Sequence, residues 1–314
     1  MNKLAVVAFG GNALLRAGQK GTIDEQEENA FLASKNLVKL LNKNYNLVLT
    51  HGNGPQVGNI LLANTAGNKL YGIPDMPLDI SVAYSQGFIG YILEQQLRNV
   101  LMQEDMDRDI ITIITEVLVN KDDPAFSNPT KPVGPYYTKE EAEAMAKETG
   151  SVFKEDARGR GWRKVVASPQ PMVIFNRRTI EKIASEEHIV IAVGGGGIPC
   201  FYKEENKLQG IDAVIDKDLA SSLLASQIRA DKLFILTDIP KVYINFNTPQ
   251  EKALDRINIA DAKKYLREGQ FGEGSMAPKI NAAVQFVERT GKDAIITETT
   301  LLGVDNGGTR VTMV

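Results

Sequence analysis

A short segment near the start of the chain has residue types that could bind phosphate. Gly10, Gly11 and Asn12 directly follow an apolar run over residues 4–9. Glycine has no Cβ atom, so consecutive backbone N–H groups can converge on an anion, and the end of a following helix would add positive potential. Paired glycines also occur in ordinary turns, and this segment alone leaves both interpretations open.

A second glycine-rich segment, His51–Gly58, follows another apolar run and could bind an anion in the same way. It contains Gly52 and Asn53, and Pro55 is well placed as the first residue of a helix. The dinucleotide-binding fingerprint would need glycine at position 57, which is valine, and the four glycines at 194–197 fail the same test. A Walker phosphate loop and the protein-kinase catalytic loop are also missing from the sequence. The segment therefore indicates an anion site of another class.

Three lysines could supply the positive charge that a phosphate site needs. Lys131 precedes a proline, Lys217 lies between two aspartates, and Lys279 follows Pro278. A solvated surface lysine is the default interpretation of each one alone. Lys217, however, lies at a predicted helix start, where positive charge is unfavourable unless the site has a use for it. We therefore interpret Lys217 as a functional residue.

Short apolar strands alternate with longer helices along most of the chain. Strands are expected over residues 4–9, 46–50, 110–114, 189–193, 232–236 and 294–297, and helices over 24–41, 55–66 and 79–103. Apolar strands separated by helices imply a mostly parallel sheet covered on both faces, with ligands bound beyond the carboxyl ends of the strands. Each glycine cluster falls at such an end.

The alternation stops between residues 120 and 171, where several prolines and a charged run occur. A flexible linker is one interpretation of this stretch. The apolar residues within it could instead pack a small subdomain. We predict an ordered excursion from the sheet.

The composition argues against nucleic-acid and membrane partners. The formal net charge is -3, so no general attraction to nucleic acid is implied, and no apolar stretch is long enough to cross a bilayer. The apolar run near the N-terminus is interrupted too early for a signal peptide. The single cysteine, Cys200, lies in an apolar run typical of a buried thiol. We expect a cytoplasmic protein.

Taken in order, these glycine, lysine and aspartate motifs resemble the carbamate kinases of the amino acid kinase family. The resemblance covers most of the chain, and its most specific parts are His51–Gly58 and the proline-flanked Lys131. It implies a three-layer α/β/α sandwich around a mostly parallel open sheet, with a small protruding subdomain at about 120–171. It also implies a homodimer whose subunits have a carbamate- and phosphate-binding domain, 1–210, and a nucleotide-binding domain, 211–314.

The resemblance assigns roles to individual residues. Those expected around the carbamate and the transferred phosphoryl group are Gly10, Gly11, Asn12, Gly52 and Asn53. Lys131 would reach in from the excursion, Lys217 and Lys279 would neutralise phosphates, and Asp218 would hold those two lysines in place. The residues expected to line the nucleotide pocket are Thr237, Asp238, Tyr243, Met276 and Pro278. No protein metal site is implied, and Mg²⁺ would be held mainly by the phosphates of ATP or ADP.

The reaction that the resemblance implies, ATP with carbamate to ADP and carbamoyl phosphate, suits these residue types. The carbamate oxygen is already anionic, so no general base is needed, and the obstacle is its repulsion from the γ-phosphate. His51 and His188 are therefore expected to have structural roles. Two alternatives stay open, namely a relative that phosphorylates an amino-acid carboxylate or a nucleoside monophosphate, and a non-catalytic nucleotide sensor.

Overall fold

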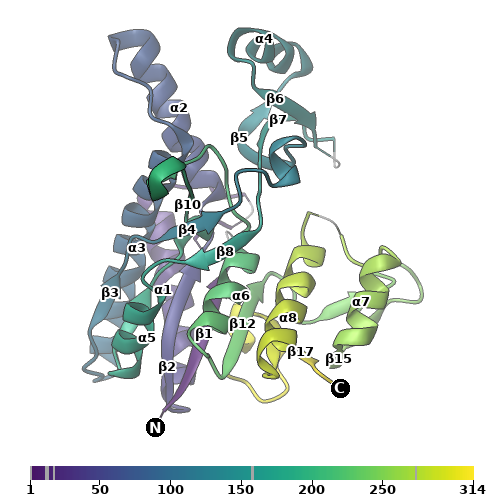
Figure 1. Ribbon diagram of the computed structural model, residues 1–314. Helices are drawn as coiled ribbons and strands as arrows, with labels where there is room; N and C mark the ends of the chain where they lie inside the picture. Colours follow the sequence, from purple (N-terminus) through teal and green to yellow (C-terminus); the bar gives the residue numbers. More distant parts are fainter. Residues whose placement is uncertain (1, 11–13, 17, 157–158, 273) are drawn as a thin grey trace.

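The computed structural model describes residues 2–10, 14–16, 18–156, 159–272 and 274–314. Within these residues the centre of the molecule is an eight-stranded sheet in the order β15-β17-β16-β12-β1-β2-β9-β3 (Figure 1). Its strands are β1 (Lys3–Phe9), β2 (Tyr45–His51), β3 (Ile110–Thr112), β9 (Ile189–Ile191), β12 (Lys232–Thr237), β15 (Arg256–Asn258), β16 (Ala294–Glu298) and β17 (Thr309–Thr312). Neighbours are parallel except β16 and β17, which confirms the predicted mostly parallel sheet.

Strand β1 shows why the sequence folds into layers. Residues 5–9 are completely buried, as expected for an apolar strand with helices on both faces. Because successive side chains alternate between the faces, Val6 and Val7 enter different cores. Val7 packs in the core of α1 (Ile23–Leu41) and α3 (Leu78–Gln103). Val6 packs in the core of α5 (Arg177–Ser185), α6 (Lys217–Gln227), α7 (Ile259–Arg267) and α8 (Met276–Thr290), which completes the three layers.

The register of β1 and β2 determines where the two glycine segments meet. The two strands pair in parallel from Lys3 and Tyr45 to Phe9 and His51. The segments that follow Phe9 and His51 therefore leave the sheet at the same edge.

The excursion predicted for residues 120–171 forms an ordered subdomain that protrudes from the main body (Figure 1). It contains a sheet in the order β5-β7-β6 and the helix α4, with bounds β5 (Lys131–Tyr137), α4 (Lys139–Thr149), β6 (Val152–Glu155) and β7 (Trp162–Val166). Val133, Ala142 and Val165 are buried, and the rings of Tyr137 and Phe153 meet edge to face with centroids 5.7 Å apart. These contacts show a packed unit, so the linker interpretation is wrong.

Helix α2 (Gly54–Tyr71) projects beside this subdomain (Figure 1). It packs against β5 at a pair of glycines, where a Cβ atom added to Gly58 would lie 2.7 Å from the Cα atom of Gly134. The backbones of α2 and β5 therefore touch without intervening side chains.

The remaining elements were not expected from the sequence. A second sheet has the order β11-β10-β4-β8, and β13 pairs with β14 as an antiparallel hairpin. Their bounds are β4 (Glu116–Val119), β8 (Pro171–Ile174), β10 (Ile198–Tyr202), β11 (Leu208–Gly210), β13 (Val242–Ile244) and β14 (Lys252–Leu254). Short 3-10 turns occur at Pro124–Phe126, Gly194–Gly196, Glu204–Asn206 and Thr299–Leu301.

One continuous main sheet joins the two halves of the chain, because β12 pairs directly with β1. The division into domains near residue 210 stays a prediction.

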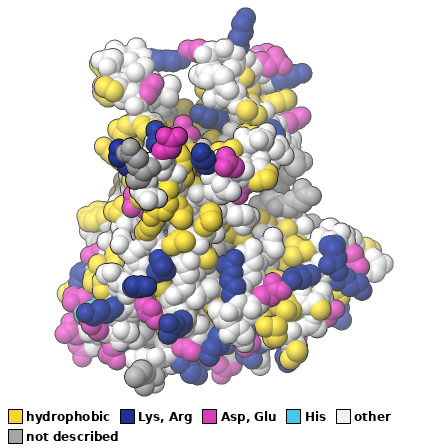
Figure 2. Space-filling view, in the orientation of Figure 1, with side chains coloured by type: hydrophobic (Ala, Val, Ile, Leu, Met, Phe, Trp, Pro, Cys, Tyr) yellow, Lys and Arg dark blue, Asp and Glu magenta, His cyan; other side chains and the backbone are white. Residues whose placement is uncertain are grey.

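Basic and acidic side chains are both spread over the face of the molecule in Figure 2. In the described part of the chain, none of the helices combines the length and apolar character required to span a bilayer.

Candidate active site

A cleft of about 690 Å³ opens at the carboxyl ends of the central strands. Its walls include Gly10 after β1, Thr237 at the end of β12 and Glu298 at the end of β16, together with the starts of α6 and α8. The edge beyond the carboxyl ends of parallel strands is where α/β folds bind ligands. The volume also suits a ligand the size of a nucleotide.

Asp218 holds two lysines at one side of this cleft. The Lys217 Nζ donates to Asp218 Oδ1 at 2.5 Å, and the Lys279 Nζ donates to Asp218 Oδ2 at 2.9 Å. Lys217 and Asp218 begin α6, whereas Lys279 comes from the first turn of α8. The Asp218 side chain is only 4% exposed, and each lysine side chain is 14% exposed. One carboxylate therefore shares its charge between two ammonium groups.

The ionisation of this cluster follows from its contacts. Burial alone would raise the pKa of Asp218, but Lys217 and Lys279 lower it far below its ordinary value, so the carboxylate is charged. Burial lowers the pKa of Lys217, against the opposing effect of Asp218. Burial also acts to lower the pKa of Lys279, yet Asp218 raises it above its ordinary value. Two cations around one anion leave positive charge at the cleft wall, where an anionic ligand would bind.

Asp216 connects the protruding subdomain to the same helix end. Its Oδ1 accepts from the backbone N–H groups of Asp218 and Leu219 at 2.9 and 3.3 Å, and so caps α6. Its Oδ2 accepts from the Nζ of Lys131, the first residue of β5, at 2.8 Å. Burial would raise the pKa of Asp216, but Lys131 lowers it. Lys131 thus reaches the cleft from the subdomain.

The two glycine segments differ in their relation to the cleft. Gly10 lines it, whereas Gly11 and Asn12 lie outside the described residues. Gly52 and Asn53 follow β2, and neither is among the described residues that line the cleft. The Asn53 side chain is buried and donates to the hydroxyl of Ser85 at 2.8 Å.

The glycines at 194–197 pack behind the second glycine segment. A Cβ atom added to Gly194 would lie 2.3 Å from His51 Nε2, and one added to Gly195 would lie 2.2 Å from Asn53 Nδ2. Gly195 also has a φ of +65°, a conformation that favours glycine. These glycines therefore leave the space that His51 and Asn53 occupy.

His51 is a neutral residue of the interior. It is 1% exposed, its Nδ1 lies 3.1 Å from the carbonyl oxygen of Gly52, and burial lowers its pKa to about 4. A neutral imidazole cannot attract an anion by charge. These properties agree with the structural role expected for His51 from the sequence.

The residues predicted for the nucleotide pocket divide into two groups. Thr237, Asp238 and Pro278 line the cleft. Tyr243 and Met276 are not among the cleft-lining residues in the described part of the chain. The Tyr243 ring lies 5.9 Å from that of Phe246, and Met276 packs against the core of α6 and α8.

Sequence reasoning did not select several residues that also line the cleft, namely Arg16, Asp216, Gly274, Ser275, Glu298, Thr299 and Thr300. Asp216 had a detectable signal, because an aspartate directly before a helix is a preferred cap. Thr299 and Thr300 follow β16, and only the pairing of β16 with β12 brings them to the cleft. The sequence has no comparable signal for Arg16.

The chain is similar to known carbamate kinases over nearly its whole length. Residues 3–298 match the amino acid kinase family. The chain is 48% identical to the carbamate kinase of Pyrococcus horikoshii over 94% of both chains. It is 50% identical to carbamate kinase 2 of Staphylococcus aureus strain MRSA252, over 95% of this chain and 94% of the relative. The solved structure of carbamate kinase from Giardia lamblia bound to AMP-PNP is 42% identical and has a TM-score of 0.91, over 99% of this chain and 98% of the other. The chain therefore belongs to the amino acid kinase family, within the group that contains these carbamate kinases.

Proposed function

We propose that the chain is a carbamate kinase, which transfers a phosphoryl group reversibly between ATP and carbamate. Its high identity to carbamate kinases over nearly the whole chain supports this proposal. The observation that carries it is the cluster in which Asp218 holds Lys217 and Lys279 beside a cleft at the carboxyl ends of the central strands.

In the proposed reaction, the lysine cluster neutralises the phosphoryl group that is transferred. Lys217 and Lys279 share one carboxylate, so their excess positive charge is available to the phosphate oxygens. Because Asp218 fixes both ammonium groups in advance, little reorganisation is needed during transfer.

The acceptor requires positioning rather than deprotonation. A carbamate oxygen is anionic at neutral pH, so it carries no proton that a base would have to remove. The neutral, buried His51 is therefore not needed as a base. In the proposal, Lys131 exchanges its contact with Asp216 for the incoming anion. The backbone around Gly10, with Gly11, Asn12, Gly52 and Asn53, would complete the substrate side.

The carboxylates of the cleft suit a magnesium ion that arrives with the nucleotide. Asp216 and Asp218 are engaged by lysines, and no group of three His, Cys, Asp or Glu side chains suited to a metal occurs among the residues described. Mg²⁺ commonly binds through phosphate oxygens, waters and one or two carboxylates. We propose that Asp238 and Glu298, which line the cleft, are the carboxylates available to it or to its waters. The ion would offset charge on the phosphates.

The nucleotide itself is proposed to lie along Thr237, Asp238 and Pro278. The solved structure of carbamate kinase from Giardia lamblia is bound to AMP-PNP, an analogue of ATP, which supports the proposal that this chain binds a nucleotide. Tyr243 and Met276 stay predictions for this pocket.

The homodimer and the cytoplasmic location also stay predictions. Helix α3 exposes Ile80, Tyr84 and Tyr91, with exposed fractions of 42%, 56% and 60%. Their spacing puts them on one face of the helix, which supports an interface between two copies.

The function is tested by measuring ATP formation from Mg-ADP and carbamoyl phosphate, after subtracting the spontaneous decay of carbamoyl phosphate. We expect Lys217→Ala to lower the rate by about a hundredfold to a thousandfold, by analogy with the loss of an oxyanion donor. Lys69→Ala is the matched control, because Lys69 is 61% exposed and pairs only with Glu148 of the subdomain in the described structure. Absence of turnover by folded wild type would refute the proposal. A screen of acetate, N-acetylglutamate, aspartate and UMP would then test the related kinases.

A further inference from the structure

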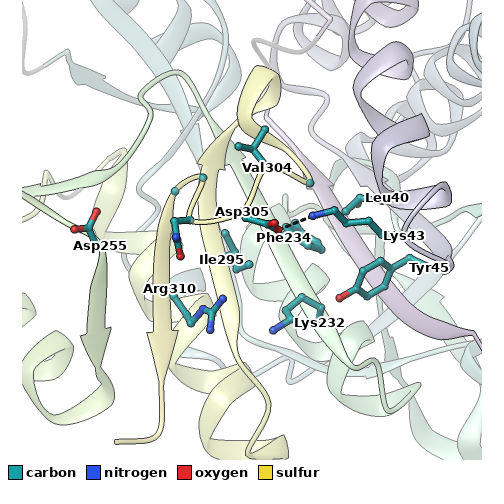
Figure 3. Close-up of a pocket in the computed structure, with 14 residues that line it drawn as sticks. Leu40, Lys43, Tyr45, Lys232, Phe234, Asp255, Ile295, Val304, Asp305 and Arg310 are labelled. Atoms are coloured by element: carbon teal, nitrogen blue, oxygen red, sulfur yellow. Dashed lines mark hydrogen bonds and ion pairs between the residues drawn. The ribbon is translucent and has the colours of Figure 1, made fainter.

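A second hollow, of about 440 Å³, lies on the main sheet (Figure 3), and none of its described lining residues also lines the cleft. Phe234 of β12, Ile295 of β16 and Arg310 of β17 are register partners on adjacent strands, so their side chains share one face and form the floor. The end of α1 borders the hollow on one side, and the loop Gly303–Gly308 borders it on another. Lining residues therefore come from both halves of the chain.

The charged residues that line this hollow differ in their ion-pair partners. Lys43 Nζ donates to Asp305 Oδ1 at 2.6 Å, and Asp255 is paired with Lys241. Both carboxylates that line the hollow are thus satisfied.

Lys232 and Arg310 instead share one carboxylate outside the lining, that of Asp293. It lies 3.3 Å from Lys232 Nζ and 4.0 Å from Arg310 Nη1, the latter at the outer limit of an ion pair. Figure 3 shows the two cationic side chains near each other at the floor of the hollow. Two cations and one carboxylate leave an excess positive charge at this point.

The rest of the lining suits an apolar or aromatic group. Leu40, Phe234, Ile295 and Val304 line the hollow beside the two cations. The Tyr45 ring packs edge to face on Phe234, with centroids 6.3 Å apart. Burial raises the pKa of Tyr45, and Asp231 adds to the rise, so its hydroxyl stays protonated and can donate a hydrogen bond.

One short segment joins this hollow to the candidate active site. Glu298, Thr299 and Thr300 line the cleft, whereas Gly303–Gly308, a few residues later, line the hollow. Between them Leu302 is completely buried, and the Nζ of Lys39 on α1 donates to the carbonyl oxygen of Thr300 at 2.9 Å. A ligand that displaces the loop therefore acts on a segment that is part of the cleft wall.

We propose that this hollow is a second ligand site, for a small organic anion, and that its occupancy changes the affinity of the cleft for nucleotide. A carboxylate or phosphate group would bind between Lys232 and Arg310, with an apolar or aromatic body against Phe234. The coupling rests on the proposed function, because it needs a nucleotide in the cleft. By linkage, nucleotide in the cleft changes the affinity of the hollow by the same factor.

The test for binding is a calorimetric titration with phenyl phosphate. We expect Arg310→Gln and, separately, Lys232→Gln to weaken binding by about tenfold or more, the loss of one charged hydrogen bond. Arg98→Gln is the matched control, because Arg98 pairs with Glu94 on α3 and its side chain is 47% exposed. Lys217→Ala, which alters the cleft, should retain binding. Far-UV circular dichroism checks that each variant is folded.

Three results would overturn the site: no binding to wild type, equal binding to wild type and both floor variants, or binding that is lost only in Lys217→Ala. The last result would assign the phenyl phosphate to the cleft. For the coupling, the dissociation constant of ADP is measured with and without saturating phenyl phosphate, and we expect a shift that Arg310→Gln abolishes. An unchanged constant would overturn the coupling. A protein that binds phenyl phosphate in the hollow but binds no ADP would contradict the proposed function and not the site.

Discussion

Replacing Asp218 with asparagine removes the charge that Lys217 and Lys279 share and leaves the shape of the side chain nearly unchanged. Asparagine keeps one acceptor oxygen but places an N–H donor against the other lysine. The two buried ammonium groups then have no common counter-charge. We expect the folded state to become much less stable and the cleft to lose its arrangement of lysines.

The size of this effect can be worked out from the contacts. At 2.5 and 2.9 Å, each contact with Asp218 has a gross Coulomb attraction of about 6 kcal/mol at an effective dielectric constant of about 20. Desolvation of the charges offsets much of this attraction in the native protein. Removing one partner of a buried ion pair typically costs about 3–5 kcal/mol, because the remaining charges stay buried, and we expect a loss in that range.

The assay is urea unfolding followed by far-UV circular dichroism. Fluorescence is less suitable, because the single tryptophan, Trp162, lies in the protruding subdomain. The matched control is Asp305→Asn, which removes a carboxylate that is 92% exposed and 2.6 Å from Lys43, and should leave the midpoint unchanged. A loss of less than about 1 kcal/mol in Asp218→Asn would refute a stabilising role for this carboxylate.

The pH dependence provides a second check on Asp218. The lysines lower its folded pKa below the ordinary 3.8, so its contribution is fully present above that pH and is lost as the pH falls below it. An NMR titration of the wild-type protein should therefore show the Asp218 carboxylate ionised from neutral pH down to about pH 4. A midpoint at or above 3.8 would contradict the reasoning.

Two further predictions concern the glycine run at 194–197 and the histidine against which it packs. Gly195→Ala should destabilise the protein by at least about 1–2 kcal/mol from its positive φ alone. The control in urea unfolding is Gly87→Ala, where an added Cβ atom meets no atom within 4 Å. Equal effects of the two substitutions would contradict the close packing around Gly195. Because burial lowers the pKa of His51 from 6.5 to about 4, the unfolded chain takes up a proton first. The protonation of this group should therefore lower the stability of the folded protein by about 3 kcal/mol as the pH falls from 6.5 to 4. An NMR titration of its imidazole with a midpoint near 6.5 would rule this out.

The strands of the main sheet could be predicted where burial on both faces leaves a continuous apolar run, as in β1 and β12. Strand 189–193 was predicted two residues too long, because Val193 has a φ of 55°, and 110–114 also ends early, at Thr112. Helix α2 runs to Tyr71, five residues beyond the prediction. β10 was missed because Pro199 argues against a central strand. The strands β11, β13, β14 and β15 have three residues each and, unlike the equally short β3 and β9, do not lie within a longer apolar run.

The candidate site was less accessible from the sequence, because its contacts join residues that are far apart in the chain. Asp218 lies beside Lys217 but is separated from Lys279 by 61 positions, and Lys131 is separated from Asp216 by 85. Motif spacing cannot detect such pairs. The roles of the lysines and of Asp218, which holds two of them, came from the resemblance, whereas the contact of Lys131 with the helix-capping Asp216 could be seen only in the fold. Tyr243 and Met276 show the opposite case, since proximity in sequence to cleft residues did not bring them to the cleft.

The close approach of Gly58 to Gly134 restricts how the protruding subdomain can move. A backbone-to-backbone contact has no side chain that could change rotamer to absorb a shift, so a displacement of β5 must push on α2. Helix α2 starts directly after Asn53, whose side chain is held by Ser85 of α3. Gly58 lies near the start of α2, so such a displacement would act on the chain close to Gly52 and Asn53, on the substrate side of the proposed site.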